Sequence, residues 1–180
     1  NELVDANGDY LSHILPVDPT LHWANPPGGT AGRDTRPSFI GTPGRYTGPV
    51  PIVTHVHGSH VADDSDGFTE AWFLPAANNI PAGYATTGTF YDVFKPRAEA
   101  RIGQAWDPGS AVFQYSNDQR ATTLWYHDHT LGMTRLNVYA GPAGFYLLRG
   151  GGNAAADDLD LGYNPPGPIL GQGVNPGTIT

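Results

Sequence analysis

Two short histidine pairs have the residue type and spacing to bind a metal ion. His55 and His57 form one His-x-His, and His127 and His129 form the other; each ends a run rich in β-branched or aromatic residues. Such runs are typical of β-strands, whose side chains alternate between two faces, so both imidazoles of a pair project from one face. Two such strands side by side would direct four imidazoles into one small volume. Neutral imidazole is the usual protein ligand for copper, zinc and iron.

The composition limits the metal but leaves more than one interpretation open. The chain has no cysteine, which excludes thiolate zinc sites, iron–sulfur clusters and type 1 blue-copper sites from this chain alone. An all-imidazole set suits copper or zinc. The four imidazoles could close one tetrahedral zinc site, or they could supply half of a larger cluster. In a third interpretation they are metal-free polar residues at a sheet edge.

The elements that must position the histidines are predicted to form an all-β domain. The 180 residues include 24 glycines and 17 prolines without a repeat, which favours a domain with many turns and long loops. Roughly seven or eight short strands are expected, and this number fits a Greek-key β-sandwich or barrel. The predicted segments are strands at 51–57, 89–94, 111–115 and 122–127, a helical turn at 98–101, and apolar stretches at 136–139 and 143–148.

The predicted domain covers residues 1–150, and residues 151–180 read as a Gly/Pro-rich linker or extended arm. The formal net charge of −8 argues against a nucleic-acid partner. No apolar run is long enough to span a membrane. The chain begins at Asn1 rather than Met, so we expect a cleaved, processed or truncated product. The absence of cysteine does not fix the compartment, and a secreted or cell-envelope location is slightly favoured.

The segments His55-Val56-His57-Gly58 and Trp125-Tyr126-His127-Asp128-His129 resemble the first two copper motifs of the multicopper oxidases. The stretches Asp64-Ser65-Asp66-Gly67, Glu70-Ala71-Trp72-Phe73 and 134–141 strengthen the likeness, which covers about residues 10–150 and is greatest to the bacterial branch with spore-coat laccase, bilirubin oxidase and phenoxazinone synthase.

The resemblance implies a cupredoxin-like fold and a trinuclear copper centre that reduces dioxygen to water. It implies that His55 binds the type 2 copper and that His57, His127 and His129 bind the type 3 pair. Asp66 matches the acidic residue that assists proton delivery during oxygen reduction. In the alternative interpretation, Asp66 is only the first residue of an Asp-Gly turn.

This sequence departs from the family pattern because two further motifs, one rich in histidine and one His-Cys-His, do not occur in it. We therefore expect the N-terminal part of an oxidase, catalytically incomplete without the remaining portion that carries the other histidines and the cysteine. Dioxygen and a small phenolic or metal-ion substrate are the expected reactants. The alternative is a non-catalytic, histidine-rich metal-binding β-module.

Other conspicuous residues near the motifs are given structural roles. His60 is predicted to be a solvated loop residue, and Asp128 to point to the opposite strand face, where it would bond an arginine such as Arg135. The remaining predictions are surface strands for His13 and His22, core or pocket walls for Trp23, Trp72 and Trp125, and core packing for Met133.

Overall fold

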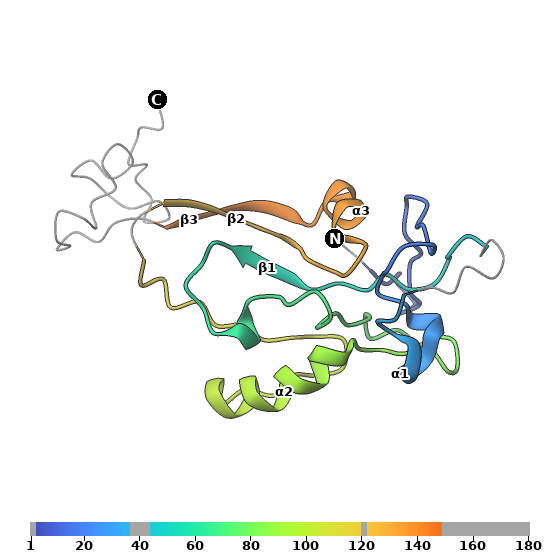
Figure 1. The fold of residues 1–180 in the computed structure, drawn as a ribbon, viewed down its shortest axis with the longest axis horizontal. Helices are drawn as coiled ribbons and strands as arrows, with labels where there is room; N and C mark the ends of the chain where they lie inside the picture. Colours follow the sequence, from blue (N-terminus) through green and yellow to red (C-terminus); the bar gives the residue numbers. More distant parts are fainter. Residues whose placement is uncertain (1–2, 37–43, 120–121, 149–180) are drawn as a thin grey trace.

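The computed structural model describes residues 3–36, 44–119 and 122–148 (Figure 1). The predicted arm at 151–180 lies outside this range. The regular elements are η1 (Pro26–Gly28), α1 (Gly29–Gly32), β1 (Thr54–His57), η2 (Asp63–Ser65), α2 (Thr89–Ile102), β2 (Thr122–Asp128), α3 (Thr134–Ala140) and β3 (Ala143–Leu148).

Within residues 3–36, 44–119 and 122–148 the sheet is open, antiparallel and three-stranded, in the order β1-β2-β3. In its register His55 lies opposite His127 and His57 lies opposite Trp125, which in turn lies opposite Phe145 on β3. Directly paired residues of antiparallel strands point to the same face. The register therefore places His55, His57 and His127 on one face of the sheet together with Trp125 of β2 and Phe145 of β3.

Helix α2 corrects the prediction of a strand at 89–94. Asp34, which is far away in sequence, caps the helix: its Oδ2 accepts hydrogen bonds from the backbone N–H of Thr89 at 2.7 Å and from its hydroxyl at 2.8 Å. Gly103, with φ of 78°, ends the helix in the left-handed conformation. The helical turn predicted at 98–101 is confirmed as its last part. The buried residues, spaced for one helical face, are Tyr91, Phe94 and Ala98.

The other strand predictions are confirmed only in part. Segment 111–115 is irregular and packs against the core instead of pairing, and 136–139 lies within α3. The strand predicted at 51–57 is regular only from Thr54, because Pro51 lacks the N–H that a ladder needs, Ile52 pairs with Phe73, and the Val53 N–H bonds the Asp128 side chain. Elsewhere in the described chain, pairing is limited to isolated antiparallel bridges such as Ile52–Phe73. The result is an open antiparallel sheet with few helices, compatible with a cupredoxin-like β fold.

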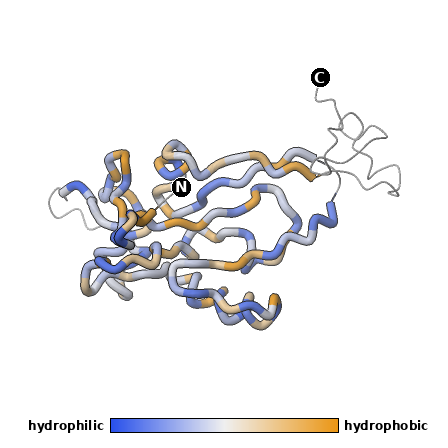
Figure 2. The backbone as a smooth tube through the Cα atoms, turned by 180° about the vertical axis from the view of Figure 1, so that it is seen from behind, coloured by the Kyte–Doolittle hydropathy of each residue, from blue (hydrophilic) through white to orange (hydrophobic). Residues whose placement is uncertain are grey.

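Among the described residues, the hydrophobic core consists of two clusters. One lies between α2 and the segment around Trp72, and the other surrounds Trp23 and the fully buried Met133. These positions confirm the structural roles predicted for the three residues. Figure 2 shows that hydrophobic stretches are short and interspersed with hydrophilic ones along the described chain.

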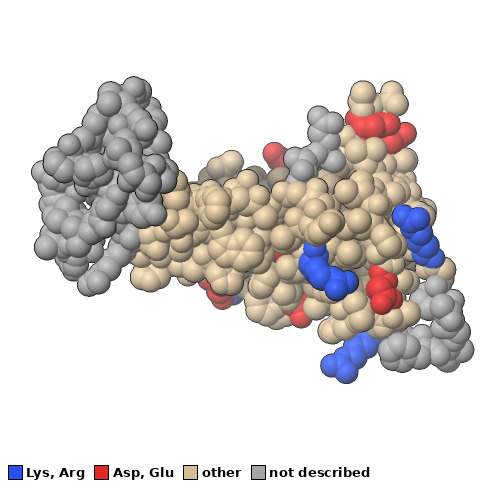
Figure 3. All heavy atoms as spheres, turned by 90° about the horizontal axis from the view of Figure 1, so that it is seen from above, with Lys and Arg blue, Asp and Glu red and all other residues tan. Residues whose placement is uncertain are grey.

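Charged side chains are scarce over β2 and β3 in the view from above (Figure 3). The sequence explains this, because β3 contains no charged residue and Asp128, the charged residue of β2, is fully buried. No helix in the described part of the chain is both long and apolar enough to cross a membrane.

Candidate metal centre

Strands β1 and β2 bring their histidines together as the period-two pattern predicts. His55 Nε2 lies 3.2 Å from His127 Nε2, and His57 Nδ1 lies 3.2 Å from the same nitrogen. One ligand atom from each of these three rings falls within 4.8 Å of the others. His55 and His127 are buried, while His57 is exposed at the rim. The three rings therefore form a compact donor cluster with one side open.

Backbone carbonyls orient three of the rings. His55 Nδ1 donates to the carbonyl of Asp66 at 2.7 Å, His127 Nδ1 to that of Asp128 at 2.6 Å, and His129 Nδ1 to that of Gly67 at 2.8 Å. A carbonyl oxygen can only accept, so each Nδ1 must carry the ring proton. In the neutral imidazole the Nε2 atom then has a free lone pair, which is the form that binds metals.

These tautomers make the donor set fit a metal cation. The Nε2 atoms of His55 and His127 lie 3.2 Å apart. With the ring protons on Nδ1, neither Nε2 atom has a hydrogen to share with the other, an arrangement that is repulsive unless a cation lies nearby. Burial and the neighbouring His129 lower the pKa of His55, which favours the neutral, metal-binding ring. Imidazole donors without thiolate suit copper or zinc.

His129 and Trp125 flank the cluster. The His129 ring stacks on His55 with centroids 4.4 Å apart and an interplanar angle of 12°, and it lies beside the compact group of three. The Trp125 and His127 rings lie 4.0 Å apart, centroid to centroid, and the Trp125 residue is 41% exposed. Trp125 is thus a wall of the site, as predicted, although it is not covered by the described chain.

Asp66 contributes to the site through its backbone as well as its side chain. Its carbonyl fixes the His55 ring, and its carboxylate Oδ1 lies 3.6 Å from the same Nδ1 while the side chain is 59% exposed. The structure therefore brings Asp66 to the histidines. Its predicted part in proton delivery stays a prediction.

Gly67 is a residue of the site that sequence reasoning missed. Its φ is +65°, and a Cβ added there would lie 2.4 Å from the Cβ of His55. Only glycine combines this backbone conformation with such a close approach. The Asp66-Gly67 turn signal was visible in the sequence, but the neighbour that forbids a side chain was not.

Asp128 lies on the opposite strand face, as predicted, but its partners are not Arg135. Its Oδ1 accepts from the Val53 N–H at 3.0 Å and the Thr130 hydroxyl at 2.8 Å; its Oδ2 accepts from the Thr130 N–H and from Asn137 Nδ2, both at 2.9 Å. Burial raises the pKa of Asp128, and these donors act in the opposite direction. The carboxylate thereby joins β1, β2 and α3 behind the histidines.

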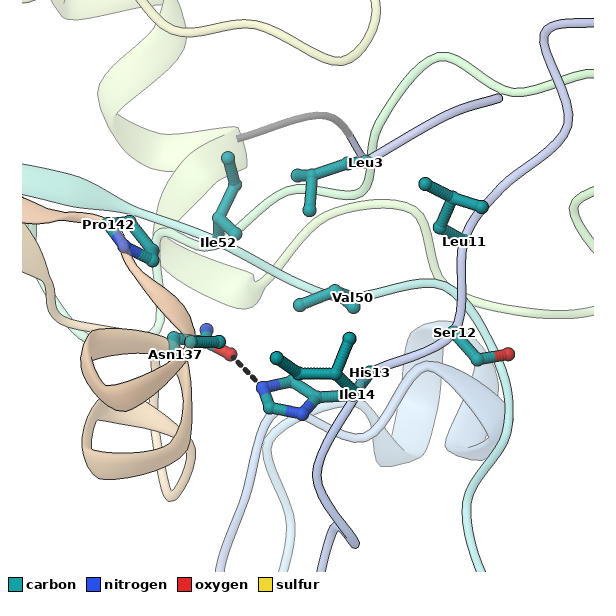
Figure 4. Close-up of a pocket in the computed structure, with 10 residues that line it drawn as sticks. Leu3, Leu11, Ser12, His13, Ile14, Val50, Ile52, Asn137 and Pro142 are labelled. Atoms are coloured by element: carbon teal, nitrogen blue, oxygen red, sulfur yellow. Dashed lines mark hydrogen bonds between the residues drawn. The ribbon is translucent and has the colours of Figure 1, made fainter. Parts of the chain in front are cut away.

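The polar network extends to His13, which corrects its assignment to a surface strand. His13 is buried; its Nδ1 accepts from the Leu15 N–H at 2.9 Å, so its Nε2 donates to Asn137 Oδ1 at 3.1 Å (Figure 4). The pair borders a mainly apolar cavity of about 150 Å³. By contrast, His22 and His60 are exposed, and His60 lies in a loop as predicted.

Helix α2 holds η2, the turn that leads into Asp66 and Gly67. Arg101 bonds the carboxylate of Asp64 with Nε at 3.1 Å and also with Nη2, whereas Arg97 bonds Asp63 at 2.9 Å. The Asp64 side chain is buried. The hydrogen bonds from Arg101 lower the pKa of Asp64 despite that burial.

The lowered pKa of Asp64 predicts a pH-dependent contribution to stability. Because the folded pKa lies below the ordinary 3.8, the ionised carboxylate stabilises the fold fully above that pH, and this stabilisation is lost as pH falls through the folded pKa. The difference in free energy of unfolding between the native protein and Asp64→Asn should therefore shrink from about pH 6 to about pH 3. Urea unfolding of both proteins measures it, and a constant difference would contradict the prediction.

No family model matches the chain. Curated relatives do. The chain is 37% identical over 138 residues to a laccase of Bacillus stratosphericus, a match that covers 77% of this chain and 19% of that protein. It is 32% identical over 137 residues to a laccase of Bacillus subtilis (76% and 19%), and 33% identical over 138 residues to multicopper oxidase LPR1 of Arabidopsis thaliana (77% and 16%).

These relatives are named laccases and multicopper oxidases, the class of copper protein whose motifs the two histidine pairs resemble. The chain belongs to the multicopper oxidase family. It spans about a fifth of the length of the curated laccases that it matches.

Proposed function

We propose that this chain supplies half of the histidine ligands of a trinuclear copper centre in a laccase-like oxidase. His55 would bind the type 2 copper, and His57, His127 and His129 the type 3 pair. The observation that carries the proposal is the 3.2 Å distance between Nε2 of His55 and Nε2 of His127, while both Nδ1 atoms bond backbone carbonyls. Membership of the multicopper oxidase family makes copper the cation that this donor set would take. The proposal includes the closed cupredoxin-type Greek-key fold.

Copper, when bound, would supply the electron-transfer chemistry that reduces dioxygen to water while a phenolic or metal-ion substrate is oxidised. The histidines of this chain would bind the copper ions, and neighbouring backbone carbonyls would orient the histidine rings. The carbonyls of Asp66, Gly67 and Asp128 hold the protons on Nδ1, so the Nε2 atoms are ready as ligands. The exposed Asp66 carboxylate, 3.6 Å from His55, could hold a proton and exchange it with solvent.

The same sheet face supports the proposed need for a partner. Trp125 on β2 and Phe145 and Leu147 on β3 share the face of the histidines by register, and they are 41%, 80% and 44% exposed. An exposed apolar patch beside a ligand cluster is typical of an interaction surface. We propose that the remaining portion of the oxidase, with the other histidines and the cysteine, covers this face and completes the site.

A second candidate function is a non-catalytic module with one ion. The compact group of three ligand atoms within 4.8 Å, without His129, favours it. This module would bind about one metal ion per chain and consume no oxygen. Copper stoichiometry therefore separates the two candidates.

The Nε2 atom of His127 lies 3.2 Å from ring nitrogens of both His55 and His57. Replacing His127 should therefore abolish most of the activity of the full-length oxidase. We expect His127→Gln to lose copper and to lower the rate of oxygen consumption at least about 100-fold, because ligand loss exceeds the 10–100-fold effect of an outer partner. Metal analysis and an oxygen electrode measure the two effects. The matched control is His60→Gln, which alters an exposed loop histidine and should leave both values unchanged.

Two results would contradict the proposal. Oxidase turnover by the isolated 180 residues would show that no further portion is needed. About one tightly bound ion per chain, with no oxygen consumption in the full-length protein, would favour the metal-binding module.

A further inference from the structure

We propose that Arg101 on helix α2 is a positioning residue for His55 and His129, acting through η2 and the backbone carbonyls of Asp66 and Gly67. The inference rests on the proposed function in assigning these two rings to copper. The link runs from a helix outside the sheet to the two ring nitrogens that must carry protons.

The first step is the grip of Arg101 on η2. Its guanidinium bonds Asp64 through Nε and Nη2, the hydroxyl of Ser65 through Nη2 at 2.9 Å, and Gln114 Oε1 through Nη1 at 2.6 Å. Asp64 and Ser65 are buried. The planar fork of arginine holds several acceptors at fixed angles, which lysine cannot reproduce. Arg101 therefore fixes both the place and the direction of η2.

The second step leads from η2 to the imidazoles. Asp66 and Gly67 directly follow Ser65, and their two carbonyls accept the Nδ1 protons of His55 and His129. The turn has little freedom, because the Asp66 N–H donates back to Asp63 and Gly67 lies against the Cβ of His55. A shift of η2 would thus move both acceptor carbonyls and release both rings from their tautomer.

Arg97 provides the contrast on the same helix, one turn earlier. It also pairs with an aspartate of η2, Asp63, at 2.9 Å, but both side chains are more than half exposed. An exposed ion pair restrains little. If positive charge near η2 were the important property, replacing either arginine would disturb the His55 and His129 rings equally. If the hydrogen bonds to buried Asp64 and Ser65 are important, only replacing Arg101 should disturb these rings.

The test compares Arg101→Met with Arg97→Met in the full-length protein, metal-free and labelled with 15N in histidine. At about pH 8, where imidazoles are neutral, the ring nitrogen shifts report which nitrogen carries the proton. In the native protein and in Arg97→Met, His55 and His129 should be Nδ1-protonated. In Arg101→Met, both should become mixtures with the Nε2-protonated form. Arg101→Lys, which keeps the charge, covers the case in which the methionine variant does not fold.

Copper titration gives the second readout. Arg101→Met should lower copper affinity about 10–100-fold, the usual effect of losing an outer partner, and Arg97→Met less than about 2-fold. Unchanged His55 and His129 tautomers in a folded Arg101 variant would overturn the inference. A native protein that binds no copper would instead contradict the proposed function, while the metal-free tautomer comparison would still decide the role of Arg101.

Discussion

Asp128→Ala is expected to lower the free energy of unfolding by about 3–4 kcal/mol, because it leaves several buried donors without an acceptor. The backbone N–H groups of Val53 and Thr130 and the amide of Asn137 all point at this carboxylate. Asp128 is fully buried, so water cannot replace it without a local opening. Since Val53 and Thr130 lie next to the ligand strands, the histidine cluster should loosen as well.

Urea unfolding followed by tryptophan fluorescence measures the effect. Asp118→Ala is the matched control, because it removes a largely exposed carboxylate and should change stability by less than about 0.5 kcal/mol. Asp128→Asn should also destabilise, since its amide N–H₂ would face donors that need an acceptor. A loss below about 1 kcal/mol for Asp128→Ala would show that the network is not important for stability.

Gly67→Ala is the second large effect, and it should act on the metal site directly. The new Cβ would lie 2.4 Å from the Cβ of His55, so either the ring or the turn must move. We expect copper affinity to fall about 10–100-fold and the free energy of unfolding to fall by about 2 kcal/mol, because a left-handed backbone conformation also disfavours alanine.

Gly83→Ala separates the effect of the collision with His55 from the effect of the left-handed backbone conformation. Gly83 has a φ of +85°, yet nothing lies within 4 Å of an added Cβ. This control therefore carries the backbone cost without the collision, and its copper affinity should equal that of the native protein. Equal copper affinities for Gly67→Ala and the native protein in a calorimetric titration would contradict the close packing of Gly67 against His55.

The histidine cluster could be predicted from sequence because its cause is local. A period of two fixes which side chains share a strand face, so His55 and His57 had to lie together on β1, whereas His129 follows the end of β2 and lies beside the group of three. The register that sets His55 opposite His127 is a long-range property, and the pattern alone did not contain it.

The residues that orient the cluster could not be predicted, because they act across long stretches of sequence. The first part of helix α2, residues 89–94, was assigned as a strand, since Asp34, which caps the helix, lies 55 residues before Thr89. Asn137 was read as part of an apolar stretch, although it joins His13 to Asp128. Hydrogen-bond partners and the space around a glycine depend on which residues the fold brings together, so sequence patterns along the chain do not predict them.

Neighbouring carbonyls of Asp66 and Gly67 serve His55 and His129, the two rings that are stacked on each other. If these rings bind different copper ions, two consecutive peptide units of one turn orient ligands of both ions. A substitution in this turn would then retune the two ions together and could not optimise one alone. Attempts to adjust the redox properties of a single ion should therefore begin at His57 or His127, whose orientation does not depend on this turn.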